Sequence, residues 1–431
     1  MLDLATLGFV GLGVIVFCTL CATLIPRPTL LVGLILLRVG ANLGTSSAGG
    51  ELLPSSAIAG LVAVVAIIAA IVPARGVLSA RLTTGSLLVV AAVGMWSLVT
   101  VYHFGPKFDY ANEFVRVASL VAMMVLAYRI GQEPGADLPK CINWLVGLPA
   151  ILTIAGYAVA WEPALNTTGR ATGTFSHANQ AAAYFAVGVV LCIWAYGQSR
   201  KRQSLVVALC GLVALLVTQS LGALAAVAVG ASVLYALNSI ITPFRRFLLI
   251  FGGLCVALAL FLTIGASGRL AEFEGADYGD RESDNSLDWR FANWQALVAI
   301  WWARSPVFGL GFGSTSDEVQ PFGTAAHSIA VQQLVETGIA GVIVAAVLVT
   351  MLLSAIHSRS RDFPATAAAL AAVCAVVVTH GLAGNWLGYT AGQYLALFGV
   401  GAMLGRTAPN LGRDLRHHFR AQEQSTRMET R

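Results

Sequence analysis

Charged residues are scarce in this chain. Only 11% of its 431 residues are Asp, Glu, Lys or Arg, whereas 57% are hydrophobic. This balance excludes an ordinary soluble protein, in which about a quarter of residues are charged. Apolar runs of about 20 residues recur along the chain, and each can cross the hydrocarbon layer as a helix. Because a helix satisfies its own backbone hydrogen bonds, the sequence predicts an all-α, polytopic integral membrane protein.

Several sequence features of other protein classes are also missing. Residues 1–25 have no basic n-region and no evident cleavage site, so we expect a retained span rather than a signal peptide. The seven cysteines lie in or beside apolar segments, which indicates neither a disulfide framework nor a thiolate metal site. The formal net charge is +5, but no basic face is interleaved with aromatic residues, so no nucleic-acid partner is predicted.

The apolar runs predict about 12 or 13 transmembrane helices. The ambiguity lies at Pro26-Arg27-Pro28, which divides the first pair of runs. The candidate spans are residues 4–25, 29–45, 56–73, 84–101, 114–130, 142–161, 177–197, 204–219, 221–240, 247–265, 328–356, 364–384 and 388–405.

Lys and Arg in short loops predict the orientation of these spans. Basic residues at 200–202, 245–246 and 359–361 are expected on the cytoplasmic side, and parity then places 101–112 and 162–176 on the opposite side. The predicted organisation is N-terminal transmembrane helices 1–267, an extracytoplasmic catalytic loop 268–327, C-terminal transmembrane helices 328–405 and a basic cytoplasmic tail 406–431. We expect the tail to lie against anionic membrane lipids.

The long loop is the most polar part of the chain. Its acidic run, Glu272–Asp288, does not follow the regular calcium-loop spacing, so a solvated acidic face is preferred over a cation site. No metal and no cofactor are predicted. Residues 287–303 read as a helix with Arg290, Trp294, Leu297 and Trp301 on one face. We expect this helix to lie in the headgroup layer, where Arg290 could bind a phosphate; the alternative is an ion pair with Asp284 or Asp288.

Two further polar stretches flank predicted spans. Gly169–Gln180 carries Arg170, His177 and Asn179 at a helix start, a place that favours an anion, although a capped helix entry is the alternative. His327 lies at the start of span 328–356 and can accept a proton from a hydroxyl near neutral pH, or serve only as a cap. Glu336, deeper in that span, is either functional or bonded to a neighbouring helix.

Several motifs together resemble a known family. They are Arg170–Asn179, Arg290-x-x-x-Trp294, Ser305-Pro-Val-Phe-Gly-Leu-Gly-Phe-Gly313, and His327 followed by Leu334–Gly341. Their order, with a long outer loop late in the chain, is similar to the O-antigen ligase and polymerase superfamily, whose members are metal-independent membrane glycosyltransferases of the GT-C type. Two positions depart from it: Ser328 stands where Asn is usual, and His177-Ala178 where Asn-Pro is frequent.

The resemblance implies roles for individual residues. Arg170 and Arg290 match the arginines that bind the diphosphate, and His327 matches the catalytic histidine; Arg269 and Arg281 are rivals to Arg290. The candidate substrate-binding residues around them are Arg269, Asn179, His177, Trp294 and Glu336.

The resemblance also implies the substrates. The donor is a glycan on undecaprenyl diphosphate, and the acceptor is a glycan or glycolipid at the outer face of the plasma membrane. Polymerisation of repeat units and ligation to a protein or wall polymer are alternatives within this chemistry. A transporter is the alternative from another class, but broken helices with mid-membrane charges are not evident.

Overall fold

The computed structural model of the chain describes residues 16, 18–41, 55–72, 80–166, 169–237, 286–382 and 384–408. These residues form helices and loops, with no strand among them. The α-helices are α2 (Arg27–Gly40), α3 (Ser55–Ile71), α4 (Ala80–Phe104), α5 (Phe108–Gln132), α6 (Leu138–Ala158), α7 (Ala178–Ser199), α8 (Arg202–Val217), α9 (Leu221–Leu237), α12 (Ser286–Arg304), α13 (Ser314–Asp317), α14 (Ile329–Arg359), α15 (Pro364–Leu382) and α16 (Thr390–Arg406). Two 3₁₀ turns, η1 (Glu162–Ala164) and η2 (Trp386–Gly388), precede α7 and α16.

The predicted all-α membrane fold is confirmed. Among the described residues, six helices are long and apolar enough to cross a membrane, and α3, α8 and α9 are shorter apolar helices. Most of span 4–25 and all of span 247–265 lie outside the described residues, as do 268–285 of the polar loop and 409–431 of the tail. The total of 12 or 13 spans therefore stays a prediction.

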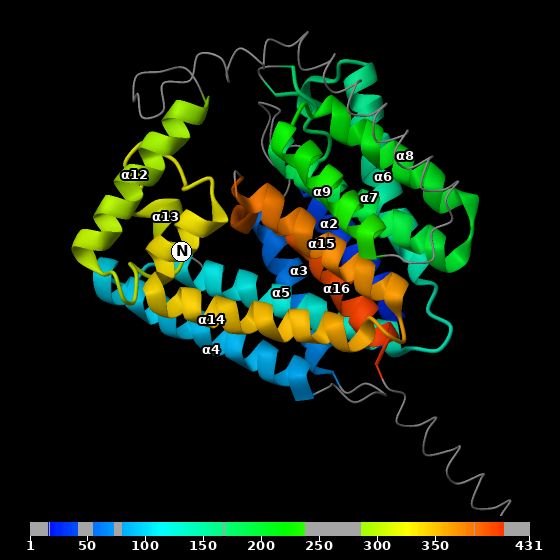
Figure 1. Cartoon of the computed structure of the whole chain (residues 1–431), viewed down its shortest axis with the longest axis horizontal. Helices are drawn as coiled ribbons and strands as arrows, with labels where there is room; N and C mark the ends of the chain where they lie inside the picture. The colour runs from blue at the N-terminus through cyan, green and yellow to red at the C-terminus, as the bar shows by residue number, and fades with distance from the viewer. Residues whose placement is uncertain are drawn as a thin grey trace, which may run out of the picture.

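Helix α7 is the centre of the bundle because its small side chains let neighbours approach closely. Four of them, Ala181, Ala182, Ala183 and Ala186, are fully buried. A Cβ placed on Gly188 would lie 2.9 Å from the Val146 side chain of α6. Helices α6, α8, α9, α15 and α16 all pack against α7. Figure 1 shows this group beside the α5–α16 pair.

Helices α5 and α16 also meet through glycine. A Cβ on Gly401 would lie 2.4 Å from the Met124 carbonyl oxygen, and a Cβ on Gly405 would lie 2.0 Å from the Tyr128 carbonyl oxygen. Glycines four residues apart allow two helix backbones to touch. This contact holds the end of α16 against the second half of α5.

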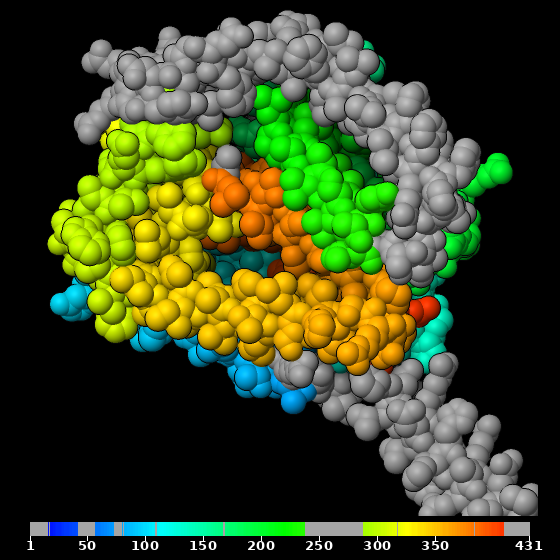
Figure 2. All heavy atoms as spheres, in the orientation of Figure 1, coloured from blue at the N-terminus to red at the C-terminus, as the bar shows by residue number. Residues whose placement is uncertain are grey.

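Helices α4, α12 and α14 lie on the other side of the molecule. Only 6% of the most apolar window of α14 is buried, so most of this long helix faces its surroundings. Figure 2 shows a hollow between α14 and the helices α15 and α9, with α5 and α16 visible in its depth. Helix α12 packs on α14 at one end of this hollow.

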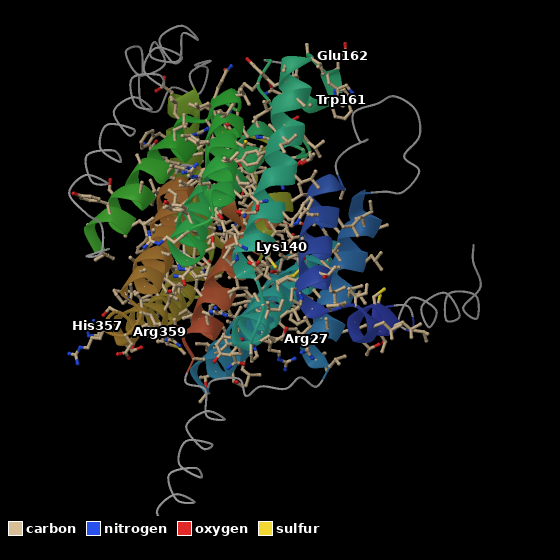
Figure 3. All side chains as sticks on the ribbon, turned by 90° about the vertical axis from the view of Figure 1, so that its right-hand side faces the viewer. Arg27, Lys140, Trp161, Glu162, His357 and Arg359 are labelled. Atoms are coloured by element: carbon tan, nitrogen blue, oxygen red, sulfur yellow. The ribbon has the colours of Figure 1, made fainter. Side chains whose placement is uncertain are left out.

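The two ends of the bundle differ in charge. Basic residues 200–202, 359, 361 and 406 lie at one end, where α7, α14 and α16 finish. The other end carries the start of α7, of α14 and of α16, and therefore Arg170, His177 and His327. In Figure 3, Trp161 and Glu162 mark this end, and Arg27, His357 and Arg359 mark the basic one.

Candidate functional site

Arg170 is held firmly before the first turn of α7. Its side chain is 9% exposed; Nε donates to the Thr218 carbonyl (2.8 Å), and one terminal nitrogen donates to Asn179 Oδ1 (2.7 Å). His177 is the N-cap of α7, and its Nδ1 accepts from the Asn179 backbone N–H (3.1 Å). The helix entry therefore presents a fixed arginine next to a histidine.

The two glycines in this entry serve different purposes. Gly169 has φ +73° and open space where a Cβ would lie, so its backbone is accessible at this point. Gly173 has φ +60°, but a Cβ there would lie 2.0 Å from the Thr153 hydroxyl oxygen on α6. The missing side chain of Gly173 therefore allows the loop to pack on α6.

The predicted loop helix exists as α12, one residue longer at each end than expected. Its position differs from the prediction. Trp301 and Leu297 are buried in a small apolar core with Leu310 and Val335. Trp302 is 68% exposed on another face of α12. The expected headgroup contact is therefore wrong for Trp301, because its face packs on protein.

Two side chains of α12 hold the segment that carries His327. The Trp294 indole N–H donates to the Ala326 carbonyl (2.6 Å), and the Asn293 amide donates to the Ala325 carbonyl (3.2 Å). The Trp289 ring meets the His327 ring edge-on, with centroids 5.5 Å apart. Trp294, expected to bind substrate, thus has a clear part in placing His327.

His327 itself has an unusual backbone. Its φ of +51° lies in the left-handed region, which few non-glycine residues adopt. Its Nε2 lies 3.1 Å from the Thr324 hydroxyl. Such a conformation persists where surrounding contacts enforce it, as those from Trp294 and Asn293 do here.

The pKa values of His327 and His177 depend on the other predicted site residues. Burial, then the charge of Arg290, then His177 lower the pKa of His327 to about 4. Loss of water around the ring, followed by the charge of Arg170, lowers the pKa of His177. These pairings place Arg170, His177, Arg290 and His327 in one region. Both imidazoles are neutral at neutral pH, so each can accept a proton.

The glycine-rich segment 305–313 docks on a break in α14. Gly338 has φ +64° and ψ −167°, which interrupts the helix and exposes backbone groups. Leu310 N–H donates to the Val335 carbonyl (2.9 Å) and Gly311 N–H to the Glu336 carbonyl (2.8 Å). From α4, the Trp96 indole donates to the Phe308 (2.8 Å) and Thr337 (3.0 Å) carbonyls. Segment 305–313 therefore has a structural role: it holds the broken part of α14, the helix that begins just after His327.

Glu336, on α14, also takes part in these structural contacts. Its carboxylate accepts from the Thr315 hydroxyl (2.6 Å) and from the Gln332 amide (3.0 Å), and the residue is 2% exposed. These contacts match the predicted alternative in which Glu336 is bonded to a neighbouring element. They leave it poorly placed to bind a substrate.

The structure adds residues that the sequence analysis did not single out. His380 ends α15, and Tyr389 follows η2; their rings meet edge-on at 6.0 Å. The charge of Arg290 acts on both His380 and Tyr389, and the charge of Arg170 acts on Tyr389. Arg116 on α5 secures η2 by donating to the Leu387 carbonyl (2.7 Å). The signal that could have found them is polar residues interrupting the apolar runs 364–384 and 388–405.

Some predicted residues cannot be placed. Arg269, Arg281, Asp284 and the rest of the acidic run except Asp288 lie outside the described residues. Asp288 is fully buried, so the expected solvated face is wrong at this position. Within the part of the chain that the structure describes, no group of three or more His, Cys, Asp or Glu is arranged to hold a metal ion.

One region of the chain matches a known protein family. Residues 206–346 match the family model described as O-antigen ligase. About a third of the chain is thus similar to the O-antigen ligase family. The matched region contains Arg290 and His327, whereas Arg170, His177 and Asn179 precede it. No curated protein and no solved structure matches the chain.

Proposed function

We propose that this protein is a membrane glycosyltransferase that moves a glycan from undecaprenyl diphosphate to an acceptor hydroxyl. The observation that carries the proposal is the placement of Arg170, Arg290 and His327 in one region at the less basic end of the bundle. The similarity of residues 206–346 to the O-antigen ligase family supports a lipid-linked glycan as donor. Under the proposed orientation, this end faces outward from the plasma membrane.

The proposed chemistry is a single displacement. Negative charge grows on the lipid diphosphate as the sugar–phosphate bond breaks, and the two guanidinium groups stabilise that charge without a metal ion. Arg suits this task because its planar fork binds two oxygens at once. His327 takes the proton from the acceptor hydroxyl as its oxygen attacks the anomeric carbon, and the configuration inverts.

The low pKa of His327 gives the donor a further role. The free protein keeps this histidine neutral, which leaves it ready to act but makes it a weak base. A bound diphosphate would offset the nearby arginine charge and raise the pKa of His327. Donor binding would thereby strengthen the base.

The test is transfer by the purified full chain from a defined undecaprenyl-diphosphate glycan, with EDTA present. Lipid A core, a second lipid-linked repeat unit, and a protein or wall polymer are offered as acceptors in parallel. Transfer to lipid A core would establish a ligase, and chain growth would establish a polymerase. Transfer to none, or transfer lost in EDTA and restored by magnesium, would contradict the proposal.

A further inference from the structure

Thr324 and His327 are neighbours in the loop that leads into α14. Gly323, with φ +69°, closes a turn in which its backbone N–H donates to the Gln320 carbonyl (3.0 Å). Thr324 follows this turn directly, and its hydroxyl oxygen lies 3.1 Å from Nε2 of His327. The side chains at the two ends of segment 324–327 therefore meet.

Helix α12 holds the two residues between them. The Asn293 amide donates to the Ala325 carbonyl (3.2 Å), and the Trp294 indole N–H donates to the Ala326 carbonyl (2.6 Å). The two carbonyls that precede His327 are thus already hydrogen-bonded. Among the described residues, the His327 ring makes no hydrogen bond other than the one to Thr324. The residue is half-buried, so part of it remains accessible to an incoming group.

The position of one proton on the His327 ring decides what this contact does. The pKa of about 4, lowered first by burial, means that the imidazole is neutral at neutral pH and carries one N–H. A threonine hydroxyl can accept a hydrogen bond from Nε2–H or donate one to a bare Nε2. In the first case Nδ1 keeps its lone pair. In the second case Nδ1 carries the proton and cannot act as a base.

We infer that the Thr324 hydroxyl accepts a hydrogen bond from Nε2–H of His327 and so leaves the lone pair of Nδ1 to take the acceptor's proton. This inference rests on the proposed function and names the reacting atom of its base. Thr324 is then a positioning residue. During transfer, the proton of the acceptor hydroxyl passes to Nδ1 while its oxygen bonds to the anomeric carbon. The electron pair of the sugar–phosphate bond leaves with the diphosphate.

The same hydrogen bond selects the orientation of the ring. Trp289 meets the His327 ring edge-on, with centroids 5.5 Å apart, and so restricts the plane of the imidazole. A half-turn about the Cβ–Cγ bond would keep this plane but would put a ring carbon where Nε2 faces Thr324. A base that is held in one tautomer and one orientation by a third group is ready to act without rearrangement.

The test compares three threonine variants of the full chain. Thr324→Val keeps the shape of the side chain without its hydroxyl, and Thr324→Ser retains the hydroxyl. Thr350→Val is the control, since the Thr350 hydroxyl donates to the Ala346 carbonyl within α14 (2.8 Å). Nitrogen NMR of histidine-labelled, detergent-purified protein at neutral pH reports the tautomer, and His327→Asn identifies the signal. Turnover and donor binding are measured on the same preparations.

In the wild type and in Thr324→Ser, Nε2 of His327 should show the pyrrole-type shift of a protonated nitrogen, and Nδ1 the pyridine-type shift of a bare one. Thr324→Val should show averaged shifts from a mixture of tautomers. Its turnover should fall by about 3- to 10-fold, the effect of losing one hydrogen bond, while donor binding is unchanged. Thr350→Val should behave like wild type in all three measurements.

A protonated Nδ1 in the wild type would overturn the inference, because that nitrogen could not then accept the proton. Wild-type shifts in Thr324→Val would also overturn it, whatever the turnover, since Thr324 would then support only the loop. Either result leaves the proposed function standing as long as the wild type transfers glycan. Absence of transfer by the wild type would instead remove the proposed function.

Discussion

The Trp294 indole N–H donates a 2.6 Å hydrogen bond to the carbonyl of Ala326, the residue that precedes His327. Helix α12 thus binds the backbone of the residue that precedes His327, the proposed base. Together with Asn293, it holds a segment whose histidine has a left-handed backbone. The arrangement explains why a tryptophan follows the proposed phosphate-binding arginine by one helical turn.

We predict that Trp294→Phe lowers turnover by about 5- to 10-fold, because a hydrogen bond of about 1 kcal/mol no longer fixes the His327 segment. Donor binding should change little. Trp302→Phe is the control, since Trp302 lies on the same helix with an exposed ring. Steady-state transfer kinetics check the prediction, and equal turnover in the two variants would contradict it.

The second prediction concerns the charge of Arg290. Its proximity lowers the pKa of His327, so Arg290→Gln should raise that pKa from about 4. Arg304→Gln, on the exposed far end of α12, should leave it unchanged. Histidine ring NMR on the free protein, with His327→Asn to identify the signal, gives the titration. An unchanged titration midpoint of His327 in Arg290→Gln would show that the charge of Arg290 does not act on His327.

The same pKa has a consequence for stability. An unfolded histidine titrates near pH 6.5, well above the value of about 4 for folded His327. Between these values the unfolded chain binds more protons, so the free energy of unfolding should fall as the pH falls from about 6.5 to about 4. In His327→Asn this part of the pH dependence should disappear.

A further prediction tests whether Arg290 acts through the paired hydrogen bonds of its guanidinium group. Arg290→Lys keeps the positive charge but loses paired hydrogen bonds to phosphate oxygens, so transfer should still be strongly impaired. Arg304→Lys provides the matched change on the same helix. Transfer near the wild-type rate in Arg290→Lys would point to Arg269 or Arg281 as the second phosphate ligand.

Another prediction concerns the orientation of the chain in the membrane. Glu162 and Asp362 are exposed at opposite ends of the bundle. In a chain whose seven native cysteines are replaced by alanine, Glu162→Cys should react with an impermeant maleimide in spheroplasts. Asp362→Cys should react only after lysis. The opposite pattern would place the candidate site on the cytoplasmic face.

Much of the fold could be predicted from hydropathy. The bounds of α7, α14, α15 and α16 follow the apolar runs closely, because the membrane requires long apolar helices. Helix α12 was also evident, since its apolar residues recur with helical spacing. The sequence did not show whether the tryptophan-bearing face of α12 would contact lipid or protein, because tryptophan suits both environments.

The remaining features depend on contacts between distant segments. The break at Gly338 exists because segment 305–313 docks there; a Cβ at Gly338 would lie 2.3 Å from the Val307 carbonyl oxygen. Glu336 faces α13 for the same reason. Tyr389 and His380 lie near α7 because the end of α15 and the start of α16 belong to helices that pack against it, which hydropathy does not reveal.

The most direct test measures donor binding and glycan transfer separately in His327→Ala and in His327→Asn, which better tolerates the left-handed backbone. If His327 is the base, both variants should bind undecaprenyl-diphosphate glycan nearly as wild type does. Turnover should fall by about 10²–10⁴-fold, the usual effect of removing general-base help. Near-normal turnover in both variants would contradict the account and leave His177 as the next candidate.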